Sequence, residues 1–242
     1  MLFADRPRGA AAFLLVTALL GGSTLFADPA EAPRAVSGFE SAPLGFEPNL
    51  GQAEPSVRYL ARGGGFALRL AEREARIRLG GGAAFRLRLA GNGPVSSWSV
   101  EERLAGLTHY SRGNDRSRWL RNVPSFRRVV QHGVFPGIDW VWYGTRSEPE
   151  YDFRVAPGAS PRAIRFEIAE AESLSIAADG ALQLSVGGRS LSFGAPRAYQ
   201  ETPNGRREVE SRYRLRGRTV SFALGAYDSD LPLAIDPVLR VP

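Results

Sequence analysis

The chain lacks cysteine and lysine and has only two histidines among its 242 residues. Without cysteine, disulfide bonds are excluded, so stability must come from apolar burial and backbone hydrogen bonds. Every basic residue is an arginine, and the formal net charge is +6. His109 and His132 lie far apart in the sequence and lack the i, i+4 spacing of a zinc-binding helix. We therefore expect no metal site and no cofactor.

Long apolar runs are also missing, except for one near the N-terminus. Residues 10–20 are apolar apart from Thr17, follow two arginines and precede a tail of small residues. This run is shorter than the roughly 20 apolar residues that span a bilayer, and the pattern is typical of a cleaved secretory signal. We predict a signal peptide over residues 1–27, with cleavage after Ala32 as the weaker alternative. The expected location is secreted or in the cell envelope (periplasm or cell surface), with no transmembrane anchor after cleavage and no nucleic acid as partner.

Alternation of apolar and polar residues with a period of two dominates the chain from Val57 onward. Such alternation is the pattern of half-buried strands, and glycine-rich turn sequences separate the runs. The sequence therefore predicts an all-β, antiparallel fold, a β-sandwich over residues 46–242 that follows a flexible leader over residues 28–45. Two packed β lobes with a boundary near residues 156–161 are the alternative. Residues 99–104 are too few for a stable helix, and we expect a loop or a single turn there.

Short motifs spread along the chain occur in the order and spacing of a known family. They include residues 46–52, 133–139 and 232–239. On these motifs the chain resembles the uncharacterised N-terminal domain of bacterial proteins that carry SBBP (β-propeller) repeats. The resemblance implies an extracellular or cell-envelope β module with no assigned catalytic residues. Relatives continue into repeats where this sequence ends at Pro242, so we expect that the domain works alone or that its repeats are lost or supplied by another chain.

Arginine is concentrated between Arg58 and Arg88, where eight arginines face only two glutamates. The arginines alternate with apolar residues, so we expect them on the outer face of adjoining strands. In the simpler interpretation, acidic faces of neighbouring strands complement them. In the sharper interpretation they form a docking face for an anionic partner, either a glycan or an envelope protein. Arg78 and Arg86 are then the candidate ligand-binding residues.

Four tryptophans are a second source of candidate binding residues. Trp140 and Trp142 alternate on one face of a strand that also carries Ile138, which favours a place in the core over a sugar-binding platform. We expect Trp98 and Trp119 to lie in loops and to be the more exposed pair. They are therefore candidates for ligand binding.

Three carboxylates are the best candidates for catalysis. Glu150 and Asp152 lie two apart in a predicted strand, and Asp139 precedes them across a predicted hairpin, so the three could converge as in glycoside hydrolysis. An ion-pair ladder with Arg154 is the structural alternative. A Ser-His-Asp triad is not expected, because no Gly-x-Ser-x-Gly motif is present. We predict an exported, non-enzymatic interaction module of unknown ligand, with a carbohydrate-active hydrolase as the alternative.

Overall fold

The computed structural model describes residues 42–91, 96–237 and 239–240. The predicted signal peptide, and the predicted leader up to residue 41, lie outside these residues. Within them the chain forms nineteen strands and two short 3-10 helices, and it has no α-helix. The strands are β1 (Phe46–Pro48), β2 (Val57–Arg62), β3 (Phe66–Ala71), β4 (Glu74–Leu79), β5 (Ala84–Leu89), β6 (Ser97–Tyr110), β7 (Leu120–Phe135), β8 (Ile138–Gly144), β9 (Pro149–Val155), β10 (Arg165–Ala169), β11 (Ser173–Ile176), β12 (Leu182–Val186), β13 (Arg189–Phe193), β14 (Arg197–Thr202), β15 (Gly205–Val209), β16 (Ser211–Arg216), β17 (Thr219–Leu224), β18 (Leu233–Asp236) and β19 (Leu239–Arg240). The 3-10 helices are η1 (Arg116–Arg118) and η2 (Pro161–Ala163).

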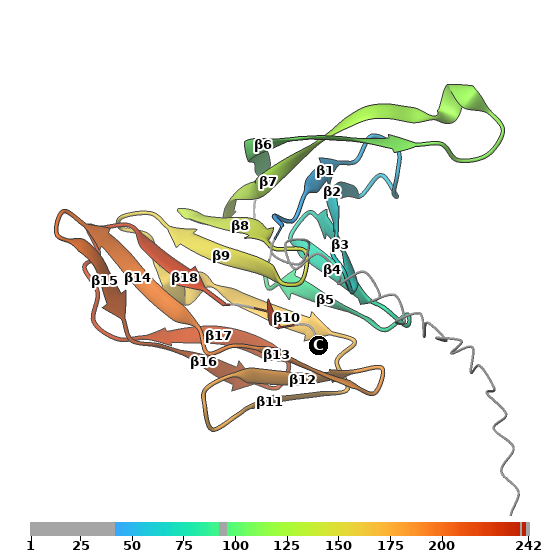
Figure 1. Ribbon diagram of the computed structural model, residues 1–242. Coiled ribbons are helices and arrows are strands. Elements are labelled where there is room, and N and C mark those ends of the chain that lie inside the picture. The colour runs from blue at the N-terminus through green and yellow to red at the C-terminus, as the bar shows by residue number, and fades with distance from the viewer. Residues whose placement is uncertain (1–41, 92–95, 238, 241–242) are drawn as a thin grey trace, which may run out of the picture. The chain divides into compact units, whose positions relative to one another are not determined.

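Two antiparallel sheets contain all of these strands (Figure 1). The large sheet has fifteen strands in the order β15-β14-β18-β9-β8-β7-β1-β2-β3-β4-β5-β10-β17-β16, and β6 pairs with β7 beside this path. The small sheet has the order β11-β12-β13-β19. The large sheet does not close into a ring, because its path ends at β15 on one side and at β16 on the other. The predicted all-β, antiparallel fold is confirmed.

The large sheet bends so that distant parts of its inner face pack on each other. Phe153 of β9 lies 6.4 Å from Phe166 of β10 and 6.0 Å from Phe222 of β17, measured between ring centroids. In the strand order, β9 and β10 are far apart, so these contacts join two layers of one continuous sheet. Phe193 of the small sheet adds an edge contact to Phe85 at 6.5 Å. The packing is that of a sandwich made from a single folded sheet.

The alternating sequence explains which side chains enter this core. Leu68 and Ile77 are completely buried, whereas the arginines between the apolar positions are half-buried or exposed. Trp140 and Trp142 are each only 1% exposed, which confirms the expectation that they belong to the core. Burial of a large apolar side chain contributes about 1.5–3 kcal/mol relative to exposure. Burial of the apolar residues in this alternating pattern is therefore the main favourable contribution to folding of this cysteine-free domain.

Two segments at element boundaries are joined to the rest of the domain by backbone hydrogen bonds or a β-bridge. Leu44 is fully buried, and Pro43 forms a β-bridge with Thr145, so the ordered sheet begins before Phe46. Residues 156–161, considered above as a boundary between lobes, connect β9 to η2 and β10. Gly158 of this connection donates a backbone hydrogen bond to Ser229 at 2.8 Å. The strands on both sides of the connection contribute aromatic rings to one core.

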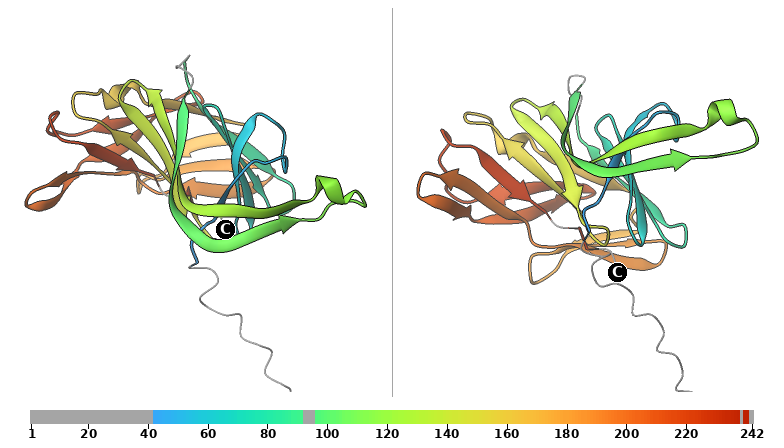
Figure 2. Two further views of the ribbon diagram at one scale, coloured as in Figure 1. Left: turned by 90° about the horizontal axis from the view of Figure 1, so that it is seen from above. Right: turned by 45° about the horizontal axis from the view of Figure 1, so that its top comes forward.

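The β6–β7 hairpin is the feature that the sequence predicts least well. Residues 99–104 were expected to form a loop or a single turn, but they lie inside β6, which pairs with β7 from Ser97↔His132 to Tyr110↔Leu120. The prediction was wrong because the hydrogen bonds of this segment go to a strand distant in sequence, and no local period indicates such a partner. The end of the hairpin, with η1, extends beyond β1 and β2 (Figures 1 and 2). We call residues 103–126 the arm.

Candidate functional site

The outer face of β3, β4 and β5 carries a row of arginines. Arg69 lies directly opposite Arg76, and Arg76 lies directly opposite Arg86. Like charges in directly opposed positions destabilise a sheet. A row of three arginines therefore requires compensating carboxylates, and we call this outer face the basic face.

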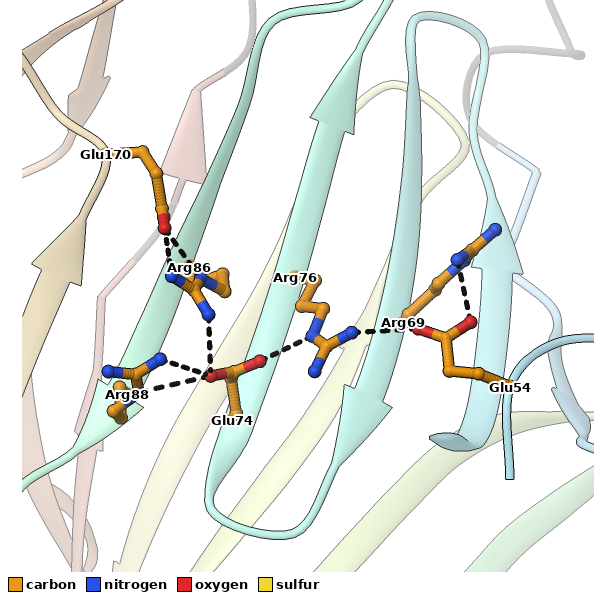
Figure 3. A network of polar contacts seen from close by, with 7 residues as sticks. All are labelled: Glu54, Arg69, Glu74, Arg76, Arg86, Arg88 and Glu170. Atoms are coloured by element: carbon orange, nitrogen blue, oxygen red, sulfur yellow. Dashed lines mark hydrogen bonds and ion pairs between the residues drawn. The ribbon is translucent and has the colours of Figure 1, made fainter. Parts of the chain in front are cut away.

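Three glutamates compensate the row (Figure 3). Glu54, from the loop after β1, lies 2.9 Å from Arg69 and 2.8 Å from Arg76. Glu170, which follows β10, accepts a hydrogen bond from Nε of Arg86 at 2.8 Å. The third, Glu74 on β4, completes the network. Acidic groups thus complement these arginines, but Glu54 and Glu170 come from loops and Glu74 from β4 itself, rather than from the acidic faces of neighbouring strands that the simpler interpretation predicts.

Glu74 is the centre of this network. Its side chain is 10% exposed and lies 2.5 Å from Arg76, 3.0 Å from Arg88 and 3.6 Å from Arg86. Burial alone would raise the pKa of Glu74. The hydrogen bonds from Arg76 and Arg88, with the nearby guanidinium charges, outweigh that effect and hold the pKa of Glu74 below its usual value. The carboxylate thus stays charged and fixes the arginine planes around it.

Arg78 differs from the other arginines of the basic face. It is exposed, and no carboxylate of the described residues lies within ion-pair distance of it. Its cross-strand neighbours are Ala67 on β3 and Ala84 on β5, whose small side chains leave space on both sides. A groove of about 500 Å³ results, lined by these three residues together with Arg69, Arg76, Arg86 and Glu170. The two predicted ligand-binding arginines are therefore unequal: Arg78 is free, whereas Arg86 is held by Glu170 and Glu74.

The two candidate tryptophans lie at opposite ends of the β6–β7 hairpin. Trp98 is in strand β6, not in a loop as predicted, because it pairs with Gln131 of β7. Its ring lies 5.8 Å from that of Tyr59. Trp119 follows η1 at the end of the arm. Both are half-buried, so the structure does not bring them together as an exposed pair.

The three candidate carboxylates share the outer face of β8 and β9 but have different partners. Asp139 accepts hydrogen bonds from the backbone N–H of Gly133 at 2.9 Å and contacts Nδ1 of His132 at 2.9 Å. Asp152 is 8% exposed and accepts a hydrogen bond from the hydroxyl of Tyr143 at 2.7 Å. Glu150 lies opposite Tyr143 in the register. Asp139 thus belongs to a different cluster from the other two.

The environments of these carboxylates differ in their electrostatics. Burial, with the charges of Asp236 and Glu150, raises the pKa of Asp152 to about 7 against the opposing hydrogen bond from Tyr143. Burial and the charge of Asp236 also raise the pKa of Glu150. Asp152 borders a groove of about 380 Å³ that Tyr143, Tyr199 and two arginines also line. A carboxyl group that exchanges its proton near neutral pH is suited to acid–base work.

A second cluster near Asp139 was not predicted. Oγ of Ser99 on β6 lies 2.7 Å from Nε2 of His132 on β7, whose Nδ1 contacts Asp139 on β8. This connectivity is that of a Ser-His-Asp triad, which the sequence analysis did not expect. The members come from three strands. In the register that pairs Gln131 of β7 with Trp140 of β8, the next position on each strand is His132 and Asp139. No local motif signals such an arrangement. Side chains of His132 and Asp139 are 40% and 34% exposed, so the cluster faces solvent.

A metal-ligand cluster and a membrane-spanning helix are both missing from residues 42–91, 96–237 and 239–240. In that part of the chain, no group of three or more histidine and carboxylate side chains could hold a metal ion. The same residues contain no helix that is long and apolar enough to cross a membrane.

Comparison with known proteins identifies the family. A family model described as a domain of unknown function (DUF7948) matches residues 46–238. The match covers more than half of the sequence, so the chain belongs to this family. No curated protein and no solved structure matches the chain. The family match carries no association with SBBP repeats, and that part of the resemblance stays a prediction.

Proposed function

We propose that this DUF7948 domain is an exported, non-enzymatic interaction module of the cell envelope or extracellular space, which binds an anionic glycan in the groove of the basic face. The single observation that carries the proposal is Arg78, a guanidinium without an ion pair in the described residues that lines a groove together with three other arginines. The apolar run at residues 10–20 supports export. The resemblance to the N-terminal domain of SBBP-repeat proteins supports a location in the cell envelope.

The groove suits a chain of anionic sugars for a physical reason. A guanidinium forks onto a carboxylate or sulfate group through two parallel hydrogen bonds, and Arg78 has its donors available. Two residues away from the Arg78 position along the sheet lie Arg69 on β3, Arg76 on β4 and Arg86 on β5, which are held in place by glutamates. Because these three arginines are occupied by their glutamates, Arg78 supplies the available donors of the groove.

Binding to soluble polysaccharides tests this function. Isothermal calorimetry with polygalacturonate, dextran sulfate and neutral dextran should detect binding of the two polyanions only. Arg78→Ser should weaken polyanion binding by about tenfold, because a hydrogen bond to a charged group contributes about 1.5–3 kcal/mol. Arg78→Lys should restore it only in part, since an ammonium group lacks the planar fork.

The matched control is Arg214→Ser, on β16. Arg214 is also exposed and has no ion pair within the described part of the chain, so the variant changes the net charge equally. If Arg214→Ser weakens binding as much as Arg78→Ser, the protein attracts polyanions by net charge alone and the groove is not the site. Binding of neutral dextran with the same affinity would also contradict the proposal.

Hydrolysis is the second candidate function, and one specific observation favours it. Ser99, His132 and Asp139 are linked as nucleophile, base and orienting carboxylate. The paired-carboxylate alternative is less well supported, because Asp139 contacts His132 and lies apart from the Asp152–Tyr143 pair. A fluorophosphonate reagent should label Ser99 if His132 activates it, and His132→Gln should then abolish labelling while the fold is retained. Absence of labelling in the wild type rejects this function.

A further inference from the structure

The end of the arm carries a second cluster of arginines, separate from the basic face. Residues 111–121, which we call the arm tip, contain four arginines and a single acidic residue, Asp115. The arginines are Arg112, Arg116, Arg118 and Arg121. The carboxylate of Asp115 accepts hydrogen bonds from the backbone N–H and the hydroxyl of Ser117. The acid therefore caps η1 and leaves the arginines uncompensated.

Lack of pairing distinguishes the arm tip from the basic face. Each arginine of the tip lies beyond ion-pair distance of every carboxylate in the described ranges. On the basic face, by contrast, Arg69, Arg76, Arg86 and Arg88 each contact a glutamate. The like charges of an unpaired cluster repel one another, which disfavours the compact state. The positive field of the cluster is thus available to an external anion.

Trp119 adds an apolar element to this charged tip. Its Nε1–H donates a hydrogen bond to the carbonyl of Gly113 at 3.1 Å, so the polar end of the indole is satisfied within the tip. The guanidinium groups of Arg116 and Arg121 lie 5.5 and 5.6 Å from the ring centre. The half-exposed ring and the flanking cations form one amphipathic surface. Tryptophan and arginine together are the residues that favour the boundary between lipid headgroups and water.

The shape of the arm indicates the kind of anionic partner. Near its middle the arm is fixed to β1, because the hydroxyl of Thr108 donates a hydrogen bond to Glu47 at 2.6 Å and the hydroxyl of Tyr110 donates another. Beyond this attachment the tip projects past β1 and β2 (Figures 1 and 2). A polymer chain fits a groove, as on the basic face, whereas a projecting tip fits a flat surface. We propose that the arm tip docks onto the surface of an anionic lipid bilayer. This proposal does not depend on glycan binding by the basic face.

Vesicle binding by the purified protein tests the proposal. Cosedimentation should show stronger binding to vesicles that contain about 30 mol% phosphatidylglycerol than to vesicles of pure phosphatidylcholine, because the anionic lipid gives the vesicle a negative surface potential. Arg112→Ser combined with Arg118→Ser leaves the cations over Trp119 in place. This double variant should weaken binding roughly 25-fold, since each basic residue near an anionic surface contributes about fivefold.

A matched pair of arginines provides the charge control. Arg214→Ser combined with Arg216→Ser removes two exposed, unpaired arginines of β16 and should change vesicle binding by less than about threefold, because these residues lie outside the tip. Arg78→Ser should also bind vesicles like the wild type. Equal losses in the tip and β16 double variants would overturn the proposal, because net charge alone would then explain binding.

Fluorescence locates the contact. Lipids brominated near the headgroup should quench tryptophan emission of the bound wild type, and Trp119→Phe should remove most of this quenching while the protein still binds. Persistent quenching in Trp119→Phe would assign the contact to a different surface. If dextran sulfate binding depends on Arg112 and Arg118 while vesicles with phosphatidylglycerol do not bind, the tip recognises a soluble polyanion, and the membrane assignment is rejected.

Discussion

Replacement of Glu74 by Gln removes the central charge of the basic face and keeps the size of the side chain. Its amide group would direct N–H donors at arginines that are themselves donors only. The amide keeps only one acceptor oxygen, so either Arg76 or Arg88 would lose its acceptor, and all three arginines, Arg86 included, would lose the nearby negative charge. The arginine row would then repel itself with one compensating carboxylate fewer.

The magnitude follows from these contacts. A hydrogen bond between charged groups contributes about 1.5–3 kcal/mol, and Glu74 accepts three of them, one from Arg76 and two from Arg88. Solvent weakens them, because the side chains of Arg76, Arg86 and Arg88 are between 34% and 46% exposed. We expect Glu74→Gln to lower the free energy of unfolding by about 2 kcal/mol, which lowers the melting temperature by about 4–8 °C in a domain of this size.

Thermal and urea unfolding, followed by tryptophan fluorescence, measure this effect. The control is Glu208→Gln, which breaks an ion pair of similar length, 3.1 Å to Arg197, between side chains that are more than half exposed. The control should cost less than about 0.5 kcal/mol. Because the pKa of Glu74 is depressed in the folded state, its stabilisation is present above the unfolded pKa, about 4.3, and is lost as the pH falls through the folded value. Equal destabilisation by both variants, or none by Glu74→Gln, would refute this account of the basic face.

Two further predictions concern the β8–β9 hairpin. The raised pKa of Asp152, about 7, means that between pH values of about 4 and 7 the folded protein holds a proton that the unfolded chain has lost. Stability should therefore fall as pH rises through this window, by at most about 1.4 kcal/mol per pH unit from this group, and the urea midpoint of Asp152→Asn should fall less. Gly144→Ala should cost at least about 2 kcal/mol and Gly188→Ala only about 1 kcal/mol. Both glycines have positive φ, 131° for Gly144 and 70° for Gly188. A Cβ on Gly144 would lie 2.3 Å from the carbonyl oxygen of Glu148, whereas a Cβ on Gly188 would meet open space. Similar melting temperatures for the two variants would contradict this reasoning.

The sequence predicts the local part of the fold and misses the pairing between distant segments. Alternation with a period of two places Leu68 in the core and Arg69 outside it, because side-chain direction in a strand depends on the backbone alone. The partner of a strand has no such local signal. The β5–β10 and β9–β18 pairs join strands far apart in the chain, and the strand character of residues 99–104 depends on β7.

The candidate site shows the same division. The outward direction of Arg78 and Arg86 follows from alternation, but their difference does not, because Arg86 is neutralised by Glu170 from a distant segment. The cluster of Ser99, His132 and Asp139 likewise depends on the register of three strands. A local sequence motif therefore does not reveal it.

Ion pairing with carboxylates, rather than the number of arginines, decides which basic surface of this protein is free to bind an anion. Introduction of a single new carboxylate beside Arg78 tests this. Ala67 lies directly opposite Arg78 on the neighbouring strand. Ala67→Glu would place a glutamate where it forms a cross-strand ion pair with Arg78, as Glu74 does with Arg88. Such a pair stabilises a sheet by about 0.2–1 kcal/mol, so the melting temperature should stay the same or rise slightly.

Glycan binding by Ala67→Glu should fall at least as far as in Arg78→Ser, because the new carboxylate both occupies the guanidinium and repels the polyanion. Ala67→Gln is the control, since it fills the same space without charge. If Ala67→Gln weakens binding equally, the groove acts by its shape. If Ala67→Glu binds polygalacturonate like the wild type, a free Arg78 is not what makes this face a binding surface, and the proposed function loses the observation that carries it.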